Sequence, residues 1–157
     1  MIEVRAHRPG TADEAALKAL FEALYAHMSA LGLGNPLVED GASLWLGAVT
    51  PMLGKLSFVH LAVADDQVVG FVAGTVRTLP AHLGGARTGA LTHIHVSADR
   101  RGEGIGHLLF QALRSSFEEK GVTRMETDVL VANADGRSFF RSIGFREDHV
   151  VLHLPIG

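Results

Sequence analysis

The chain has 157 residues, of which 47% are hydrophobic and 20% are charged, and these values predict one domain over residues 1–157 with a hydrophobic core of its own. The formal net charge of −3 gives no indication of a surface for nucleic acid or for an anionic membrane. The absence of cysteine excludes disulfides and thiolate chemistry, and no apolar stretch approaches the roughly 20 residues of a membrane span. Residues 1–10 have no signal-peptide pattern, so we expect a cytoplasmic protein.

The first part of the chain predicts a strand and two helices. Residues 2–7 alternate apolar and polar side chains, which is typical of a strand. Thr11 and Glu14 have the spacing of a capping box, and the apolar pattern that follows predicts a helix ending at Gly32. A shorter helix is expected over residues 42–49.

The remainder of the chain alternates between strands and helices. Residues 56–64 and 67–79 predict an antiparallel hairpin that turns at Asp65-Asp66. The later elements, in chain order, are a loop over 80–89, a strand over 90–97, a helix from 105 to Gly121, a strand over 122–131, a helix over 134–142 and a strand over 145–154. The order β-α-α-β-β-β-α-β-α-β predicts an α/β (α+β) fold with a mixed, mostly antiparallel sheet flanked by helices.

Three glycines stand at the start of the helix expected from 105, in the segment Arg101-Gly102-Glu103-Gly104-Ile105-Gly106. A helix start leaves backbone N–H groups without partners and carries the positive end of the helix dipole, so it attracts anions. Glycine lets an anion approach the backbone, and Arg100 or Arg101 adds positive charge. The fingerprint G-x-G-x-x-G is excluded because His107 occupies its last position, and no P-loop sequence is present. The alternative is a turn that only joins a strand to a helix.

The residues around these glycines resemble a known family. Val96, four residues and then the segment 101–106 resemble motif A of the GCN5-related N-acetyltransferases (GNAT). The pattern N-x-x-G-x-x-F-F-x-x-x-G-F from Asn133 to Phe145 is similar to motif B, which usually has alanine and tyrosine where this chain has Gly136 and Phe140. The order of the expected elements also fits, so the resemblance spans nearly the whole chain. It implies a single N-acetyltransferase domain that uses acetyl-CoA as co-substrate.

The resemblance also implies which residues contact the cofactor. Main-chain atoms of Ile94, His95 and Val96 would pair with the pantetheine arm, as an added strand would. Asn133 would hydrogen-bond that arm, and Phe140 would lie beside it, whereas Phe139 is expected to fill core. The diphosphate would be bound by backbone N–H groups of Arg101, Gly102, Glu103, Gly104, Ile105 and Gly106. A backbone N–H near Val96 would stabilise the oxyanion.

Two positions depart from the family pattern. The tyrosine that usually protonates the departing thiolate corresponds to Phe140, which has no proton to give. A glutamate that acts as base in many relatives corresponds to Thr92. The customary acid and base are therefore both absent, and water or the incoming ammonium would have to protonate the thiolate.

Histidines offer a replacement for the base. His93 and His95 share a face of the expected strand if that strand is regular, and an imidazole near pKa 6.5 suits base chemistry at neutral pH. The alternative is that both histidines are packed or hydrogen-bonded between neighbouring elements. Glu126 and Asp128 are a second choice, with a solvated strand face as their alternative. The nine histidines form no ligand set that favours a metal, so we expect none.

The acceptor amine is expected to meet the acetyl group in a cleft. The resemblance implies a cleft with walls from about 25–45 and 80–89, and its polar or aromatic candidates are Tyr25, His27, Glu39, Asp40 and Trp45. We expect direct acetyl transfer to a primary amine of a small molecule, with no nucleic-acid or membrane partner and with a homodimer as one possible assembly. The alternatives are acetylation of a protein N-terminus or lysine, and a module that binds acyl-CoA without turnover.

Overall fold

One five-stranded sheet organises the molecule, and the computed structural model describes residues 1–157. The strands follow the order β1-β2-β3-β4-β5; the first four are antiparallel to their neighbours, and β5 is parallel to β4. Their bounds are β1 Ile2–Ala6, β2 Ser57–Ala64, β3 Gln67–Thr78, β4 Arg87–Val96 and β5 Arg124–Thr127. The mixed, mostly antiparallel sheet confirms the expected fold class.

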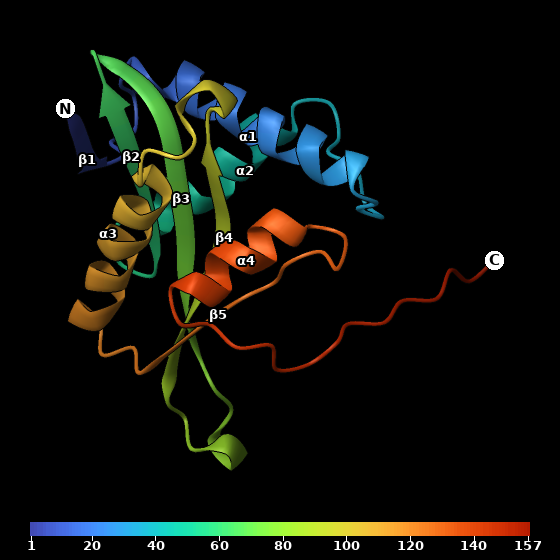
Figure 1. The fold of residues 1–157 in the computed structure, drawn as a ribbon. Helices are drawn as coiled ribbons and strands as arrows, with labels where there is room; N and C mark the ends of the chain where they lie inside the picture. The colour runs from blue at the N-terminus through green and yellow to red at the C-terminus, as the bar shows by residue number, and fades with distance from the viewer.

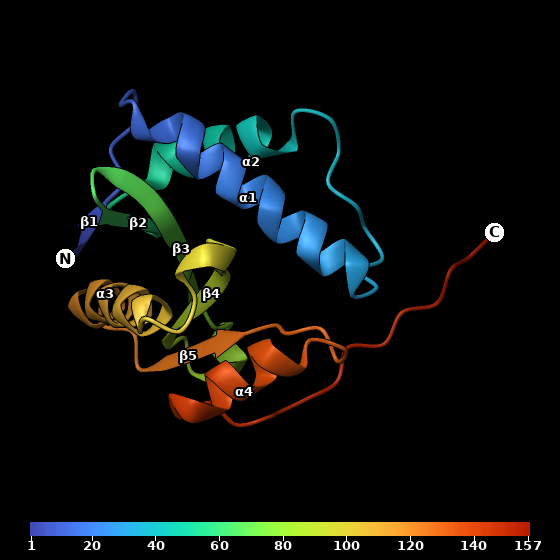
Figure 2. The same ribbon diagram turned by 45° about the horizontal axis from the view of Figure 1, so that its top comes forward.

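Helices cover both faces of this sheet (Figures 1 and 2). Helices α1, Asp13–Ala30, and α2, Gly41–Val49, lie on one face, whereas α3, Ile105–Glu119, and α4, Ala134–Ser142, lie on the other. Three short 3-10 helices complete the elements: η1 Thr50–Met52, η2 Ala81–Leu83 and η3 Ala98–Arg100. None of the helices is both long enough and apolar enough to cross a membrane.

The alternation of side chains along the central strands separates two hydrophobic cores. On β2 and β3, Leu61 and Phe71 belong to the core under α1 and α2, whereas their chain neighbours Ala62 and Val72 belong to the core under α3. Successive strand residues point to opposite faces, so strands covered on both sides become apolar throughout. β4 therefore lies between two packed layers, and a residue's position along it decides which layer its side chain enters.

Turns and helix ends follow the expected glycine and aspartate positions. Asp65 and Asp66 both have positive φ, 51° and 61°, as the tight turn of a two-residue hairpin requires. Gly32, with a φ of 98°, follows the end of α1, and Gly121, with a φ of 76°, follows the end of α3. Behind Gly121, the N–H of Val122 donates to the carbonyl of Phe117 at 3.1 Å.

The expected capping box is wrong in its details. The Thr11 hydroxyl donates to the carbonyl of Arg8 at 2.8 Å, so it accepts no N–H from the first turn of α1. Ala12 occupies the N-cap position instead. The Glu14 carboxylate still reaches back over the helix start, where it accepts the N–H of Gly10 at 2.8 Å.

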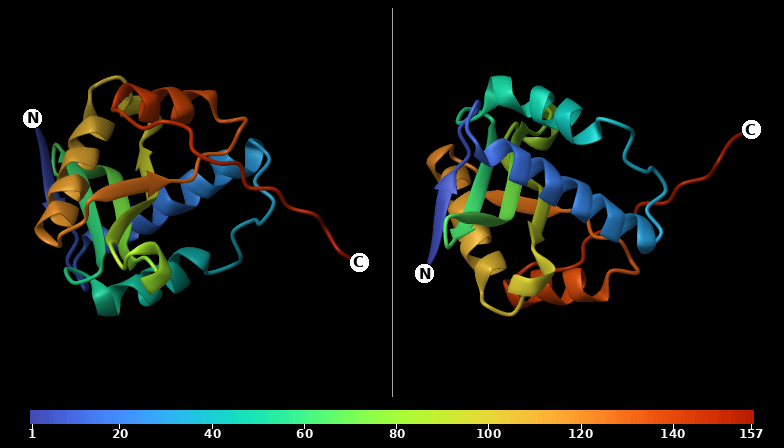
Figure 3. Two further views of the ribbon diagram at one scale, coloured as in Figure 1. Left: turned by 90° about the horizontal axis from the view of Figure 1, so that it is seen from below. Right: turned by 90° about the horizontal axis from the view of Figure 1, so that it is seen from above.

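The two expected C-terminal strands also differ from the structure. β5 covers only Arg124–Thr127 of the expected range 122–131, because its pairing with β4 stops at Leu91 opposite Thr127. The expected strand over 145–154 is absent, since no backbone hydrogen bond joins Arg146–Gly157 to the sheet. That segment leaves the body of the molecule as an extended chain (Figures 1 and 3).

Candidate active site

The glycine-rich loop before α3 presents a run of free backbone donors. The N–H groups from Gly102 to His107 donate to no acceptor in the protein. Gly102 and Gly104 have φ values of 82° and 80°, a conformation that side chains other than glycine rarely adopt. A Cβ added to Gly104 would meet nothing within 4 Å, so the approach to these donors is open. The geometry is that of an anion site at a helix start.

The third glycine of the loop has a different role from the one the sequence predicts. Gly106 already lies inside α3, and a Cβ there would approach the ring of Phe139 on α4 to 3.1 Å. Its missing side chain lets α4 pack closely against the start of α3. Gly106 therefore serves helix packing, in addition to the free N–H group that it offers to a ligand.

The two arginines of the loop are not equivalent. Arg100 is bound to Glu103 at 2.9 Å and lies 3.8 Å from Asp65, so its charge is compensated within the protein. Arg101 pairs with no carboxylate, and its Nε donates to the carbonyl of Val96 at 3.3 Å. Arg101 is therefore the cation available to an anionic ligand at the loop.

β4 leaves part of its outer edge open beside the loop. On one side β4 pairs with β3 as far as Val96, but on the other side its pairing with β5 ends at Leu91. The backbone of residues 92–96 therefore has no strand partner toward β5. This stretch contains Ile94, His95 and Val96, the residues expected to contact the cofactor through main-chain atoms. An extended polar ligand could add there as a further strand would.

A β-bulge at Thr92 precedes this open edge. His93 lies opposite Ala73, whereas Leu91 lies opposite Gly74, so Thr92 is an extra residue on β4. The Thr92 hydroxyl donates to the carbonyl of Ala73 at 3.2 Å. The strand is regular after the bulge, and His93 and His95 consequently both face the α1 layer, opposite Ala73 and Phe71.

His93 lies in an aromatic cage. Its ring centroid is 4.9 Å from that of Phe21, 5.9 Å from that of Tyr25 and 5.4 Å from that of Trp45. Nε2 lies 3.2 Å from the Tyr25 hydroxyl, and Nδ1 lies 2.9 Å from the Thr92 hydroxyl, so both ring nitrogens have partners. Burial lowers the pKa of His93 to about 4 and raises that of Tyr25. Both groups are therefore neutral at pH 7.

His95 has a freer side chain than His93. No hydrogen bond from the protein reaches its ring nitrogens, although the ring is about half-buried. Burial, followed by the positive charge of Arg101 and by His27, lowers its pKa to about 4. His95 thus connects the side-chain cluster under α1 with the cation of the glycine-rich loop.

The motif B residues pack against the start of α3. Asn133 caps α4, because its Oδ1 accepts the N–H of Gly136 at 3.0 Å. A Cβ at Gly136 would collide with the Asn133 amide, so glycine at this position preserves the cap. Phe140 is buried between the rings of Phe139 and Phe145, at centroid distances of 5.2 and 5.4 Å. Phe139, expected in the core, is only half-buried.

The remaining sequence candidates lie apart from the histidines. Glu126 faces Arg77 at 3.8 Å, and Asp128 lies exposed beyond β5. Glu39 and Asp40 are exposed before α2. The loop expected as a wall, 80–89, begins at the far tip of the β3–β4 hairpin. Its last residues, 87–89, form the start of β4, at roughly 13–20 Å from His93 along the rise of a strand.

The structure adds residues that the sequence patterns do not single out as a group. Tyr25 and Trp45 were separate candidates, but together with Phe21 they surround His93. Tyr25 and His93 are 68 positions apart, and no local pattern connects residues at that separation. No three His, Asp or Glu side chains gather in this cluster or elsewhere in the structure as a metal-binding group would require.

Comparisons with known proteins agree with this arrangement. A Danio rerio protein described as probable N-acetyltransferase 14 is 34% identical over 90 residues, which are 56% of this chain and 29% of that protein. The chain thus spans less than a third of the length of this relative. A Bacillus halodurans protein, crystallised as a tetramutant, superposes with a TM-score of 0.80 at 24% identity and covers 98% of this chain and 99% of that chain.

A second solved structure, an aminoglycoside N-acetyltransferase in complex with CoA, has a TM-score of 0.79 at 18% identity and covers 99% of this chain and 95% of that chain. At identities below 25%, TM-scores of 0.80 and 0.79 establish a common fold. The family model of the acetyltransferase (GNAT) family matches residues 39–145, which hold both the glycine-rich loop and α4. From this match and the shared fold it follows that the chain belongs to the GNAT family of acetyltransferases.

Proposed function

We propose that this protein is an acetyl-CoA-dependent N-acetyltransferase that transfers the acetyl group directly to a primary amine of a small molecule. The observation that carries the proposal is the run of unpartnered N–H groups from Gly102 to His107, placed beside the open edge of β4. A diphosphate fits the first feature, and an extended amide-containing arm fits the second. CoA carries both groups in one molecule.

The glycine-rich loop binds the diphosphate in this proposal. The free N–H groups and the positive helix end supply donors and partial charge, and Arg101 supplies a full charge. Arg101 gives up its hydrogen bond to Val96 when it turns to the phosphates, which frees the Val96 carbonyl for the pantetheine arm. The Nδ2 group of Asn133 takes no part in the cap and remains available to donate to the same arm.

The amine must reach the thioester in its neutral form. An alkylamine has a pKa of roughly 10.4, so it is mostly protonated at neutral pH. Its nitrogen forms a bond with the carbonyl carbon, the oxyanion accepts an N–H near Val96, and the carbon–sulfur bond then breaks to release the CoA thiolate. The protonated amine gives up two protons overall: one before the attack and one from the nitrogen after it has bonded to carbon. One proton ends on the CoA thiolate, delivered by water or by the incoming ammonium, and the other is released to solvent.

His95 is the side chain that we assign to proton removal. Its ring nitrogens are free, whereas both nitrogens of His93 already have partners. The pKa of His95, about 4, leaves the imidazole neutral at pH 7, so it can accept a proton directly or through water, although burial makes it a weaker base than a free imidazole. A bound diphosphate would compensate the charge of Arg101, which is one of the causes that lower the pKa of His95, and would therefore raise that pKa. His93 positions the Tyr25 hydroxyl at the acceptor side.

A small acceptor is supported by the cluster under α1. The rings of Tyr25, Trp45 and Phe21 form a compact apolar wall around His93. The solved structure of an aminoglycoside N-acetyltransferase with CoA has the same fold, and its name gives an aminoglycoside as the acceptor of that protein. These two observations favour a small amine over a folded protein substrate.

Thiol release from acetyl-CoA in the presence of a panel of small amines tests the proposal. We expect turnover with at least one small amine, with a stoichiometric amount of acetylated product by mass spectrometry. Binding of CoA without turnover on any amine or peptide would instead support a non-catalytic acyl-CoA module. Turnover confined to peptides would contradict the small-molecule assignment.

A further inference from the structure

The hydroxyl of Tyr25, the only tyrosine in the protein, stands at the end of a series of side-chain hydrogen bonds. It lies 3.2 Å from Nε2 of His93, whose Nδ1 lies 2.9 Å from the Thr92 hydroxyl. The Thr92 hydroxyl donates in turn to the backbone carbonyl of Ala73 at 3.2 Å. Helix α1 and the strands β4 and β3 each contribute to this network, so the fold, and not a local motif, aligns it.

The direction of every hydrogen bond in the network follows from its last member. A carbonyl oxygen can only accept, so the single proton of the Thr92 hydroxyl points to Ala73. The Thr92 oxygen then offers lone pairs to His93, and Nδ1 of His93 must carry the proton that joins the two groups. Burial lowers the pKa of His93 to about 4 and keeps the ring neutral at pH 7. Its Nε2 therefore carries no proton and accepts the proton of the Tyr25 hydroxyl.

The Tyr25 oxygen consequently offers only lone pairs to a ligand. A phenol has one proton, and this proton is already donated to His93. Burial raises the pKa of Tyr25, so the hydroxyl keeps that proton at neutral pH. A ligand group that binds the Tyr25 oxygen must bring an N–H or O–H of its own. A primary amine meets this condition, whereas a thioester carbonyl, which can only accept, does not.

The Tyr25 oxygen lies on the same side of β4 as the ring of His95. Tyr25 reaches His93 from α1, and the side chains of His93 and His95 both face the α1 layer (Figure 2). Side chains two positions apart on a strand are separated by roughly 7 Å. A nitrogen that is hydrogen-bonded on two sides needs roughly 6 Å between its partners. One amine nitrogen can therefore contact both the Tyr25 oxygen and the His95 ring.

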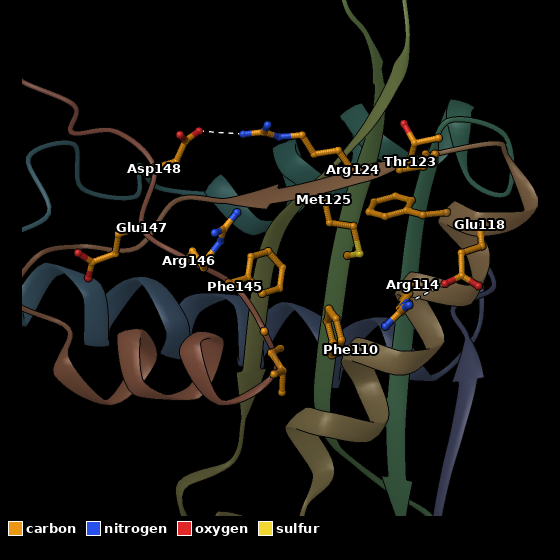
Figure 4. Close-up of a pocket in the computed structure, with 14 residues that line it drawn as sticks. Phe110, Arg114, Glu118, Thr123, Arg124, Met125, Phe145, Arg146, Glu147 and Asp148 are labelled. Atoms are coloured by element: carbon orange, nitrogen blue, oxygen red, sulfur yellow. Dashed lines mark hydrogen bonds and ion pairs between the residues drawn. The ribbon is translucent and has the colours of Figure 1, made fainter.

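The groove on the opposite side of the sheet offers no comparable site to an amine. It has a volume of about 590 Å3 and lies between α3, β5 and residues 143–148 (Figure 4). Arg114 is bound to Glu118 at 2.7 Å and Arg124 is bound to Asp148 at 2.8 Å, so these rim charges are compensated within the protein. No His or Tyr lines the groove. The neutral groups that suit an amine are those on the α1 side.

We propose that the Tyr25 oxygen accepts a hydrogen bond from the acceptor amine, and that His93 and Thr92 are positioning residues that hold the Tyr25 proton away from that amine. The inference rests on the proposed acetyl transfer. One N–H of the neutral amine binds Tyr25 and the other binds His95, which leaves the nitrogen lone pair for the thioester carbon. The nitrogen becomes positively charged as it bonds to carbon, and its hydrogen bond to Tyr25 then strengthens. Tyr25 therefore stabilises the transition state more than the bound amine.

Nitrogen NMR of the histidine rings tests the network without turnover. In the wild type we expect the proton of His93 on Nδ1. Thr92→Val removes the hydroxyl and should move this proton to Nε2, whereas Thr92→Ser should keep it on Nδ1. The matched control Thr127→Val removes another hydroxyl bond to β4, from Thr127 to the carbonyl of Leu91 at 2.9 Å, and should leave His93 unchanged. A wild-type proton on Nε2, or one that Thr92→Val leaves on Nδ1, would overturn the inference.

Steady-state kinetics tests the contact with the amine. With acetyl-CoA and phenylethylamine, putrescine or neamine as acceptor, Tyr25→Phe should lower kcat/KM for the amine roughly 10- to 100-fold, mainly through kcat, and leave KM for acetyl-CoA unchanged. Thr92→Val should lower kcat/KM roughly 10-fold, and Thr92→Ser should restore it. Wild-type turnover that Tyr25→Phe leaves unchanged would overturn this inference alone. Absence of wild-type turnover with every amine would overturn the proposed function, and the contact of Tyr25 with an amine would fall with it.

Discussion

The two faces of β4 contribute to the proposed reaction in different ways. On the side of α3, the site consists of backbone: free N–H groups from Gly102 to His107 and the unpaired edge of residues 92–96. On the side of α1, it consists of side chains: His93 with its aromatic cage, and His95. The bulge at Thr92 lies where the two parts meet, since it sets which face each following side chain enters.

The two parts of the site are therefore sensitive to different changes. The backbone part depends on glycines, so adding a side chain there blocks it. The side-chain part depends on charge and hydrogen bonds, so pH and conservative substitutions alter it gradually.

Gly104→Glu should abolish cofactor binding. The φ of 80° at Gly104 disfavours any side chain, by roughly 1–2 kcal/mol, and a carboxylate there repels a diphosphate. We expect CoA affinity by calorimetry to fall at least about 1000-fold, or roughly 4 kcal/mol. Gly84→Glu is the matched control, because Gly84 has a φ of 96° at the distant hairpin tip. Near-normal CoA affinity of Gly104→Glu would show that the diphosphate does not bind at this loop.

The burial of His93 should make stability depend on pH. Its folded pKa of about 4 lies below its ordinary value of 6.5, so between these values the unfolded chain binds a proton that the folded protein does not. Stability is therefore fully present above pH 6.5 and is lost as pH falls toward 4, by about 3 kcal/mol from this residue. Denaturant unfolding at several pH values measures the loss. His93→Gln should remove this share of the dependence, while His95, whose pKa is also about 4, keeps its own share. An unchanged slope would show that His93 does not contribute.

His95→Gln should reduce catalysis without affecting the cofactor. Removal of a proton acceptor is expected to lower kcat/KM roughly 10- to 100-fold, while CoA affinity stays unchanged because the contact of His95 with the cofactor is through its main chain. Steady-state kinetics and calorimetry on the same variant measure the two effects separately. His82→Gln, in the distant η2, is the control. A loss of CoA affinity in His95→Gln would place its side chain in the cofactor site.

Phe140→Tyr should have the smallest effect. Phe140 is buried between Phe139 and Phe145, so in the protein without CoA an added hydroxyl would lower stability by about 1 kcal/mol. We expect turnover to stay unchanged or to rise, as the hydroxyl restores the family's usual acid. A large fall in turnover, with the fold intact by circular dichroism, would show that the ring packs where no hydroxyl fits.

The backbone part of the site could be predicted from the sequence because it is local. Consecutive residues from Arg101 to Gly106 carry it, and glycine reports backbone conformation directly. The side-chain part could not, since the hydrogen bond between Tyr25 and His93 joins residues 68 positions apart. The contact of Gly106 with Phe139 is equally non-local, as it depends on the packing of α4 against α3.

The C-terminal strand shows the opposite case, in which a clear local pattern is wrong for the single chain. Residues 145–154 have the alternation of a strand, but a strand also needs a paired edge, and no backbone hydrogen bond joins Arg146–Gly157 to the sheet. Alternation indicates a preference for extended backbone, but it does not determine whether the segment pairs with a neighbouring strand.

Binding of the diphosphate by the glycine-rich loop is tested most directly by an NMR titration of the backbone amides with CoA and, separately, with pantetheine, which lacks the diphosphate. We expect CoA to shift the amide signals of residues 102–107 more than any others, and pantetheine to leave them in place while it shifts those of Ile94 to Val96. Binding of CoA with the 102–107 signals unchanged would contradict this assignment.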